Sequence, residues 1–335
     1  MSDHRSSAVE AFLRGAAWLA DDGVAYPRAD PSDARRLPAD TWLAAQIPVG
    51  VRLELTGSAS AVELTYYCPA TEPGYRGAGA GTTFSAWHAG EQIDERPAVQ
   101  GEGRVQISVG RGQLRTTIYL PEGMRPIVTG IRPIGGDIQP AAAQHRWIAY
   151  GDSITEGWVA TSPARCWPAI VARAQSLDVV NLGYAGSARG EIPTAEQIAT
   201  LDADIISIAY GTNCWSMTPH SVEMIRANTT AFLQIVRSGH PGIPVVVISP
   251  LLRPDAENQR NRLGATLAEL RTAMEEAATA ADDERVTLVP GGPLLTADSL
   301  ADGIHPGDDG HKRLAEVIGP CLTTLLGEDP TPEPR

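Results

Sequence analysis

The feature that most constrains the fold is a change in hydrophobic periodicity near residue 145. Downstream of it, short continuous runs of Val, Ile and Leu alternate with longer segments of helical periodicity. Such apolar strands are typical of a sheet covered on both faces, and regular strand–helix alternation predicts a doubly wound parallel sheet in an α/β domain. The strands are predicted at residues 146–151, 178–183, 204–211, 243–250 and 285–290, and the principal helices at 167–175, 221–239, 263–281 and 307–326.

Upstream of residue 145 the apolar residues recur with a period of two. Residues 51–55, 61–67, 104–110 and 114–120 each alternate apolar and polar side chains, and Gly-rich turns separate them. This pattern predicts an all-β sandwich, preceded by a short helix around residues 8–20. The 335-residue length also favours two domains. We therefore expect a β-sandwich domain at 1–144, an α/β domain at 145–326 and a disordered tail at 327–335.

Charge and composition exclude several classes of partner. The net charge of −13 argues against a nucleic-acid surface and against an electrostatic membrane anchor. No apolar stretch is long enough to span a bilayer. The chain start resembles no secretory leader, because Arg14, Asp21 and Asp22 interrupt and follow its apolar run, so a cytoplasmic location is expected. The cysteines form no CxxC motif, and free thiols are favoured over disulfides. They are Cys68, Cys166, Cys214 and Cys321.

Four polar clusters follow predicted strands or precede the last helix, at residues 151–153, 181–186, 210–213 and 302–306. Ligands of open parallel sheets bind beyond the carboxyl ends of the strands, so these clusters are expected to meet. Together they contain a serine, a histidine, an aspartate and amide donors, which is what nucleophilic acyl transfer requires.

Each element also has a simpler interpretation. Ser153 is a favoured residue type for capping a helix N-terminus, and Asp302 has the residue type that stabilises turns. A second D-x-x-H pattern ends at His311, although this histidine is expected inside the last helix. The remaining histidines have no matched context and are predicted at the surface. These are His4, His88, His145, His220 and His240.

The four clusters, GDSIT, NLGYAG, GTN and DGIHP, resemble in sequence and order the blocks of the SGNH, or GDSL, hydrolase superfamily. This resemblance implies a flavodoxin-like catalytic domain with a Ser-His-Asp triad and an acyl-serine intermediate. Ser153 would be the nucleophile, His305 the base and Asp302 the residue that orients it. The oxyanion hole would consist of the Ser153 and Gly186 backbone N–H groups and the Asn213 side-chain amide. No metal or organic cofactor is implied.

The β-rich segment ahead of the catalytic blocks resembles the jelly-roll sandwich of certain carbohydrate esterases, which implies a sugar in the site. Some GDSL acyltransferases of actinomycete polyketide pathways fit the Arg-rich, Lys-poor composition. The favoured function is transfer of an acyl group from an ester or thioester donor to a sugar hydroxyl of a small glycosylated molecule. Removal of such a group by an O-acyl esterase stays open. Thioesterase or lysophospholipase activity, or carbohydrate binding without catalysis, are minor alternatives.

Aromatic residues near the clusters are candidates for contacting the substrate. Trp215, two residues after Asn213, is predicted to line the site, whereas Trp167 on its predicted helix is expected in the core. The polar segment 253–262 follows a strand end and is a candidate lid. Cys214 carries no sign of an activated thiol.

Overall fold

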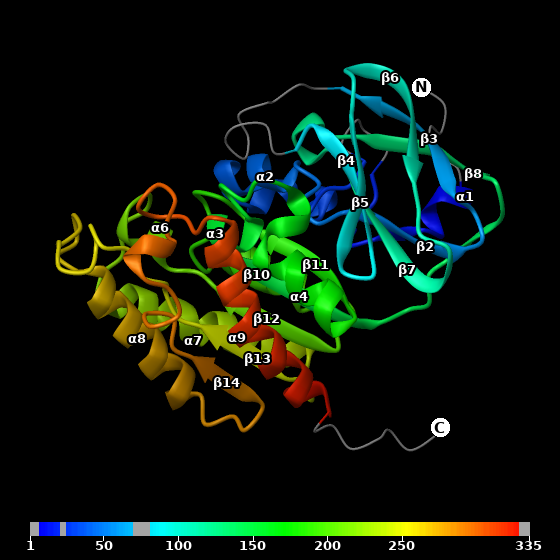
Figure 1. Cartoon of the computed structure of the whole chain (residues 1–335). Coiled ribbons are helices and arrows are strands. Elements are labelled where there is room, and N and C mark those ends of the chain that lie inside the picture. The colour runs from blue at the N-terminus through cyan, green and yellow to red at the C-terminus, as the bar shows by residue number, and fades with distance from the viewer. Residues whose placement is uncertain (1–6, 21–24, 70–80, 328–335) are drawn as a thin grey trace.

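The computed structural model describes residues 7–20, 25–69 and 81–327. The predicted disordered tail at 327–335 lies outside these residues except for Gly327, which is the last residue of a helix. Figure 1 shows a β-rich part, coloured from blue through cyan to green, beside a larger part in which helices surround a central sheet. No helix among the described residues is long and apolar enough to cross a membrane.

The central sheet has the predicted doubly wound arrangement. In the described residues it contains five strands in the order β11-β10-β12-β13-β14, and every neighbouring pair is parallel. This is the flavodoxin-like order, in which ligands bind where the direction of winding reverses. The strands are β10 (His145–Gly151), β11 (Leu177–Gly183), β12 (Ile205–Ala209), β13 (Val245–Ile248) and β14 (Val286–Val289).

Helices cover both faces of this sheet because successive residues of each strand point to opposite sides. Ile148 and Tyr150 of β10 pack in one cluster with α5 (Ile192–Ile198), α7 (Val222–Gly239) and α8 (Leu267–Ala280). Trp147 and Ala149 pack in another with α4 (Trp167–Gln175) and α9 (Asp308–Gly327). The continuous apolar strands of the sequence are therefore explained by burial on both sides.

The first part of the chain forms the predicted β-sandwich. Two antiparallel sheets contribute alternate side chains to one apolar core, which contains Leu53, Leu64, Phe84, Ile107 and Ile118. Except at the β4–β5 hairpin, each connection from β2 to β9 passes from one sheet to the other. One sheet contains β1 (Leu13–Arg14), β2 (Arg52–Gly57), β4 (Thr83–His88), β5 (Glu91–Pro97), β7 (Gly112–Tyr119) and β9 (Ile138–Pro140); the other contains β3 (Ala61–Cys68), β6 (Gly101–Ser108) and β8 (Ile127–Ile134).

The helix predicted at residues 8–20 is wrong beyond its first turn. Helix α1 spans only Ser7–Glu10, and β1 then pairs with β2. Gly15 has a φ of +76°, and a Cβ at this position would lie 2.5 Å from the Gly50 carbonyl oxygen. The close backbone approach at Gly15 is incompatible with a continuous helix.

Much of the segment 25–50 packs on the parallel-sheet domain although it precedes most of the sandwich, whereas Ala25 and Tyr26 at its start lie in the sandwich core. The segment forms a 3₁₀ helix at Pro31–Arg36 and α2 (Ala39–Ala45). Ala29, Leu37 and Ala45 lie in the same core cluster as Ile148. The boundary at residue 144 stays a prediction, but part of the N-terminal sequence belongs to the core around the second sheet.

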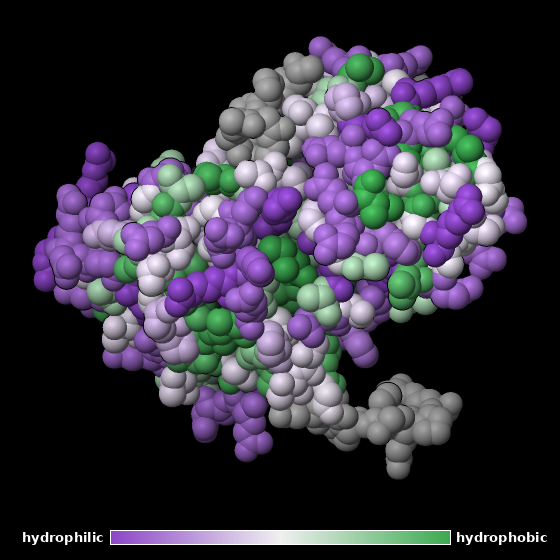
Figure 2. Space-filling view, viewed as in Figure 1, coloured by the Kyte–Doolittle hydropathy of each residue, from purple (hydrophilic) through white to green (hydrophobic). Residues whose placement is uncertain are grey.

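Buried polar contacts join the two parts. The Arg52 side chain is 1% exposed, donates to Asp178 Oδ1 at 2.8 Å and to the Val179 carbonyl at 2.9 Å, and pairs with Glu54 at 2.7 Å. Figure 2 shows a largely polar face on which hydrophobic residues gather in small groups, one of them near the junction of the two parts.

Candidate active site

Three polar segments meet at the carboxyl edge of the parallel sheet. Ser153 begins α3 (Ser153–Glu156) after β10, Gly186 lies in the loop after β11, and Asn213 lies in α6 (Thr212–Trp215) after β12. Because β11, β10 and β12 are neighbours in this order, the three segments emerge side by side. They surround the point where the winding direction of the sheet reverses, where ligands of this architecture bind.

Ser153 is not the residue that caps its helix. Asp152 occupies the N-cap position, and its Oδ1 accepts the Ile154 N–H at 3.0 Å. The Ser153 hydroxyl instead lies 2.9 Å from Nε2 of His305, and the serine is 5% exposed. The packing is tight at the preceding Gly151, where a Cβ would lie 2.5 Å from the Ala209 carbonyl oxygen. The strand therefore turns sharply into α3 and directs the hydroxyl toward the histidine.

A short turn ahead of α9 fixes the imidazole. Asp302 Oδ2 lies 2.7 Å from His305 Nδ1, while Oδ1 accepts the backbone N–H groups of Ile304 and His305 at 3.0 and 2.7 Å. One carboxylate therefore both stabilises the turn and contacts the ring. A bridge between Leu300 and Pro306 closes the base of the loop. Because Nδ1 faces a carboxylate, Nε2 is the ring nitrogen left to accept a proton from Ser153.

The candidate oxyanion donors have unused hydrogen-bonding capacity. Within the part of the chain that the structure describes, the N–H groups of Ser153 and Gly186 donate to no protein acceptor. The Asn213 Nδ2 group donates one hydrogen to the Ala188 carbonyl at 3.1 Å, which leaves its second hydrogen available. Gly186 has a φ of +72°, a backbone conformation in which glycine is unstrained.

Two carboxyl groups near Ser153 respond differently to their surroundings. Burial raises the pKa of Asp152 to about 6, more than its hydrogen bond from Ile154 and the charge of His305 lower it. Burial also acts to raise the pKa of Asp302, but the hydrogen bonds from His305 and Ile304 outweigh this effect and lower the pKa. Asp302 therefore stays ionised at neutral pH, as a residue that orients an imidazole should.

Trp215, which was predicted to line the site, contacts residues of the candidate lid. The Trp215 indole N–H donates to the Gln259 carbonyl at 2.8 Å, and the Arg253 guanidinium lies 4.8 Å above the ring. The candidate lid at 253–262 is thus fastened at Gln259, and the Asn261 amide donates to the His220 carbonyl at 2.9 Å. Whether Trp215 also contacts the substrate stays a prediction.

Another tryptophan lies beside His305. The Trp158 ring centroid is 6.3 Å from that of His305, and Trp158 packs against Ile47 and Val49 of the N-terminal segment. Burial raises the pKa of the Cys214 thiol, which agrees with the expectation that it is not activated. In the described residues no group of three or more His, Cys, Asp or Glu side chains could hold a metal ion.

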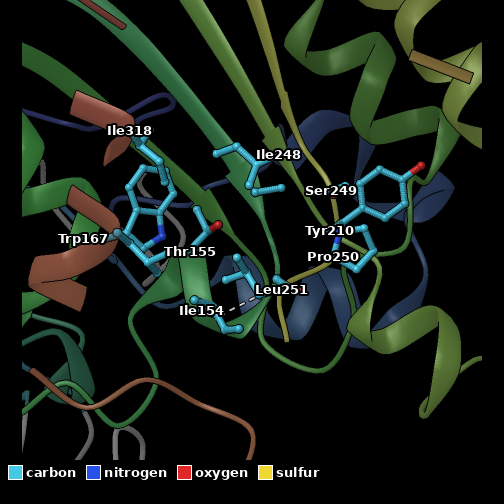
Figure 3. Close-up of a pocket in the computed structure, with 12 residues that line it drawn as sticks. Ile154, Thr155, Trp167, Tyr210, Ile248, Ser249, Pro250, Leu251 and Ile318 are labelled. Carbon is cyan, nitrogen blue, oxygen red and sulfur yellow. Dashed lines mark hydrogen bonds between the residues drawn. The ribbon is translucent and has the colours of Figure 1, made fainter. Parts of the chain in front are cut away.

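Ile154 and Thr155 of α3 line a small cavity, whose lining residues are drawn in Figure 3. Its volume is about 20 Å³, close to that of a single water molecule. Neither Ser153 nor His305 lines it, so it is not a substrate pocket. Trp167, predicted in the core, lines it and is 1% exposed. Its wall also includes Asp152, Tyr210, Ile248, Ser249, Leu251 and Ile318.

Two histidines predicted at the surface are buried instead. His220 is 4% exposed and contacts the Asn228 side chain at 3.1 Å, and His240 is 8% exposed and contacts the Ile198 carbonyl oxygen at 2.9 Å. His220 lies just before α7 and His240 directly follows it, and their burial depends on contacts that the local sequence does not reveal. His311, the competing D-x-x-H histidine, is buried inside α9, and its Nδ1 accepts the Trp167 N–H at 3.3 Å.

Two buried charged residues near the site were not predicted from the sequence. Arg28 and Glu156 are each 1% exposed and lie 3.5 Å apart. Glu156 closes α3, and its Oε2 accepts the Ala185 N–H at 2.8 Å, one residue before Gly186. Nothing in the sequence separates Arg28 from the many other arginines. The position of Glu156, three residues after the serine of a short helix, was the available signal.

The flavodoxin-like sheet and the serine–histidine contact at its carboxyl edge are typical of one class of protein. Its members act on ester bonds as hydrolases or transferases. Residues 149–313 match the model of the GDSL-like Lipase/Acylhydrolase family. No curated protein matches the sequence.

Solved structures similar to this chain include a salicylyl-acyltransferase, SsfX3, from a tetracycline biosynthetic pathway. It is 26% identical, with 93% of this chain and 94% of that chain covered at a TM-score of 0.80. A family two carbohydrate esterase from Clostridium thermocellum in complex with cellohexaose is 14% identical, covering 83% and 92% at a TM-score of 0.61. An acetyl xylan esterase, Est2A, from the rumen bacterium Butyrivibrio proteoclasticus is 16% identical, covering 83% and 90% at 0.57. At 14% and 16% identity, the similarity to the two esterases concerns the fold alone.

Proposed function

We propose that the protein is a serine-dependent acyl-transfer enzyme that forms an acyl-serine at Ser153. The observation that carries the proposal is the chain of contacts from the Ser153 hydroxyl to His305 at 2.9 Å and on to Asp302 at 2.7 Å. Both contacts lie within the reach required of a nucleophile, a base and an orienting carboxylate. The family whose model residues 149–313 match supports chemistry at ester bonds.

The proposed reaction has two steps. His305 Nε2 accepts the hydroxyl proton as Ser153 Oγ bonds to the acyl carbon of an ester or thioester. The resulting oxyanion accepts hydrogen bonds from the Ser153 and Gly186 N–H groups and from the Asn213 amide. When the tetrahedral intermediate collapses, the bond to the leaving alcohol or thiol breaks, and the leaving group takes the proton from His305. A second hydroxyl compound then attacks the acyl-serine, with His305 again as the base.

We further propose that the second nucleophile is a sugar hydroxyl of a small glycosylated molecule, and that the enzyme is a tailoring acyltransferase. Support for transfer comes from the 26% identity, over 93% of the chain, to the salicylyl-acyltransferase of a tetracycline pathway. Support for a sugar comes from the shared two-part fold with a carbohydrate esterase in complex with cellohexaose. A carbohydrate O-acyl esterase is the alternative function. The cytoplasmic location belongs to the same proposal.

Acyl partitioning tests this function. Purified protein and its Ser153→Ala variant receive aryl ester and thioester donors with no acceptor, with glycosides, or with a polycyclic alcohol that carries no sugar. Mass spectrometry then quantifies free acid and acylated acceptor. Acylated glycoside in excess of free acid, absent with the variant, would establish the transferase. Acylation of the polycyclic alcohol alone would refute the sugar acceptor.

The remaining outcomes decide between the alternatives. Free acid that no acceptor diminishes would indicate an esterase, and hydrolysis restricted to thioesters or lysophospholipids would identify the minor activities. Equal inactivity of wild type and variant on every donor, with glycan binding retained, would indicate a non-catalytic carbohydrate-binding protein.

A further inference from the structure

A buried ion pair contacts the backbone immediately before the Gly186 oxyanion donor. Glu156, the last residue of α3, accepts the Ala185 N–H through its Oε2 at 2.8 Å, and Ser153 is the first residue of the same helix. One four-residue helix therefore carries the nucleophile at its first residue and, at its last, the acceptor for the neighbouring loop.

Arg28 contacts the same backbone segment. Its Nη2 lies 3.5 Å from Glu156 Oε2, and its Nη1 donates to the carbonyl of Gly183. Its guanidinium carbon lies 5.1 Å from the centre of the Tyr184 ring, and the Tyr184 hydroxyl donates to the Arg28 carbonyl oxygen. Residues 183–185 are therefore held at three consecutive positions by Arg28 and its partner.

The N-terminal segment in turn fixes Arg28. The Nε group donates to the Ile47 carbonyl at 2.6 Å, and Nη2 donates to the Ala44 carbonyl at 2.7 Å. Both acceptors belong to the segment 25–50, which lies outside the family-matched residues 149–313 and much of which packs on the second domain. This part of the chain therefore reaches the edge of the sheet where acyl transfer is proposed.

These contacts restrict the orientation of the Gly186 N–H. Peptide units are planar, so only the φ and ψ angles of Ala185 separate its own anchored N–H from the peptide unit that carries the Gly186 N–H. The packing beneath is also tight, because a Cβ on Gly183 would lie 2.2 Å from the Glu156 backbone nitrogen. A carboxylate paired with a guanidinium is a stronger and better-oriented acceptor than a neutral group.

We infer that Glu156 and Arg28 are positioning residues that aim the Gly186 N–H at the oxyanion, so that the N-terminal segment is part of the acyl-transfer site. This inference rests on the proposed function. It assigns Glu156 a role that a purely structural ion pair would not have: its loss should weaken binding of the transition state more than binding of the substrate.

Glu156→Ala and Glu156→Gln test the inference, with Glu54→Ala as the matched control. Glu54 is 3% exposed and pairs with Arg52 at 2.7 Å, yet it lies on β2 of the sandwich. The measurements are kcat and KM on an aryl acetate, the active fraction by fluorophosphonate titration, and Ki for a trifluoromethyl ketone, which forms a tetrahedral adduct with an active serine.

For Glu156→Ala we expect kcat per active serine to fall about 10²-fold at little-changed KM, the loss typical of a misplaced catalytic group, and Ki to rise in proportion. Glu156→Gln keeps an oxygen for the Ala185 N–H and should stay within about tenfold of wild type. Glu54→Ala should lower the melting temperature but leave kcat per active serine and Ki unchanged.

Different results overturn the inference and the proposed function. If wild type turns over the ester and folded Glu156→Ala keeps kcat and Ki within about threefold, the inference alone is refuted. If Glu156→Ala does not fold, Arg28→Lys tests the inference instead. Lysine keeps the positive charge but lacks the planar guanidinium with its several N–H donors. Wild-type kcat and Ki in this variant would contradict the inference. If wild type shows no turnover beyond that of Ser153→Ala, the proposed function is refuted and the inference falls with it.

Discussion

Asp152→Asn is expected to stabilise the protein in a pH-dependent manner. Burial raises the pKa of Asp152 from an ordinary 3.8 to about 6 in the folded state. A carboxyl group whose pKa is higher when folded adds stability below its unfolded pKa, and this contribution is lost as the pH rises through the folded pKa. One pKa unit corresponds to about 1.4 kcal/mol, so ionised Asp152 costs the folded protein about 3 kcal/mol relative to the protonated form.

Asparagine removes this titration and can still cap the helix, because its side-chain oxygen can accept the Ile154 N–H that Asp152 accepts at 3.0 Å. The stability of the variant relative to wild type should therefore increase by about 2 kcal/mol between pH 4.5 and pH 7.5, over which most of the titration occurs. Urea unfolding at several pH values measures this difference, and acid effects at other residues cancel in the comparison.

The exposed Asp202→Asn is the control, because it removes the same formal charge without touching a buried side chain. Its difference from wild type should vary by less than about 0.5 kcal/mol over the same range. A relative stability of Asp152→Asn that is constant with pH, or that decreases as the pH rises, would refute the reasoning from burial.

Three further substitutions test the site. Asn213→Ala should lower kcat by about 10²–10³-fold on a slow ester, and retention of more than about a third of the activity would contradict its oxyanion role. Asp302→Asn should cost about 10²-fold in kcat/KM, because a charge at this distance is worth about 1–4 kcal/mol and the Asp302 side chain is 43% exposed; a loss below about threefold would argue against orientation of His305. Gly183→Ala should lower the melting temperature by several degrees, since its Cβ would meet the Glu156 backbone at 2.2 Å, and calorimetry showing no change would contradict this packing.

The sheet architecture could be predicted from the sequence because burial on two faces leaves a local signature. The continuous apolar strands at 146–151 and 178–183 indicate burial on both faces of a sheet. The alternating strands at 51–55 and 61–67 indicate burial on one face. The position of the candidate site could be predicted from the same pattern, because the residues that follow parallel strands lie at one edge of the sheet. The order of the four blocks then indicated Ser153 and His305, which the structure places 2.9 Å apart.

Local reasoning failed where a contact with a distant residue determines the outcome. Asp152 and Ser153 are adjacent and both have side chains that cap helices, so the sequence does not decide between them. In the structure Asp152 caps the helix, and the Ser153 hydroxyl contacts His305, which is 152 residues away along the chain. The helix predicted at 8–20 failed for a similar reason, because close approach of Gly15 to the Gly50 backbone ends it.

The sequence by itself determined the two kinds of sheet, their order and the residue types that acyl transfer needs, because these depend on periodicity and on short spacings. Only the tertiary structure decided that much of the segment 25–50 packs on the second domain and that Arg28 meets Glu156, 128 residues away. Arginines are numerous in this chain, and what distinguishes Arg28 is its burial against a partner. Burial is a property of the packed chain in three dimensions, so it has no counterpart in the spacing of residues along the sequence.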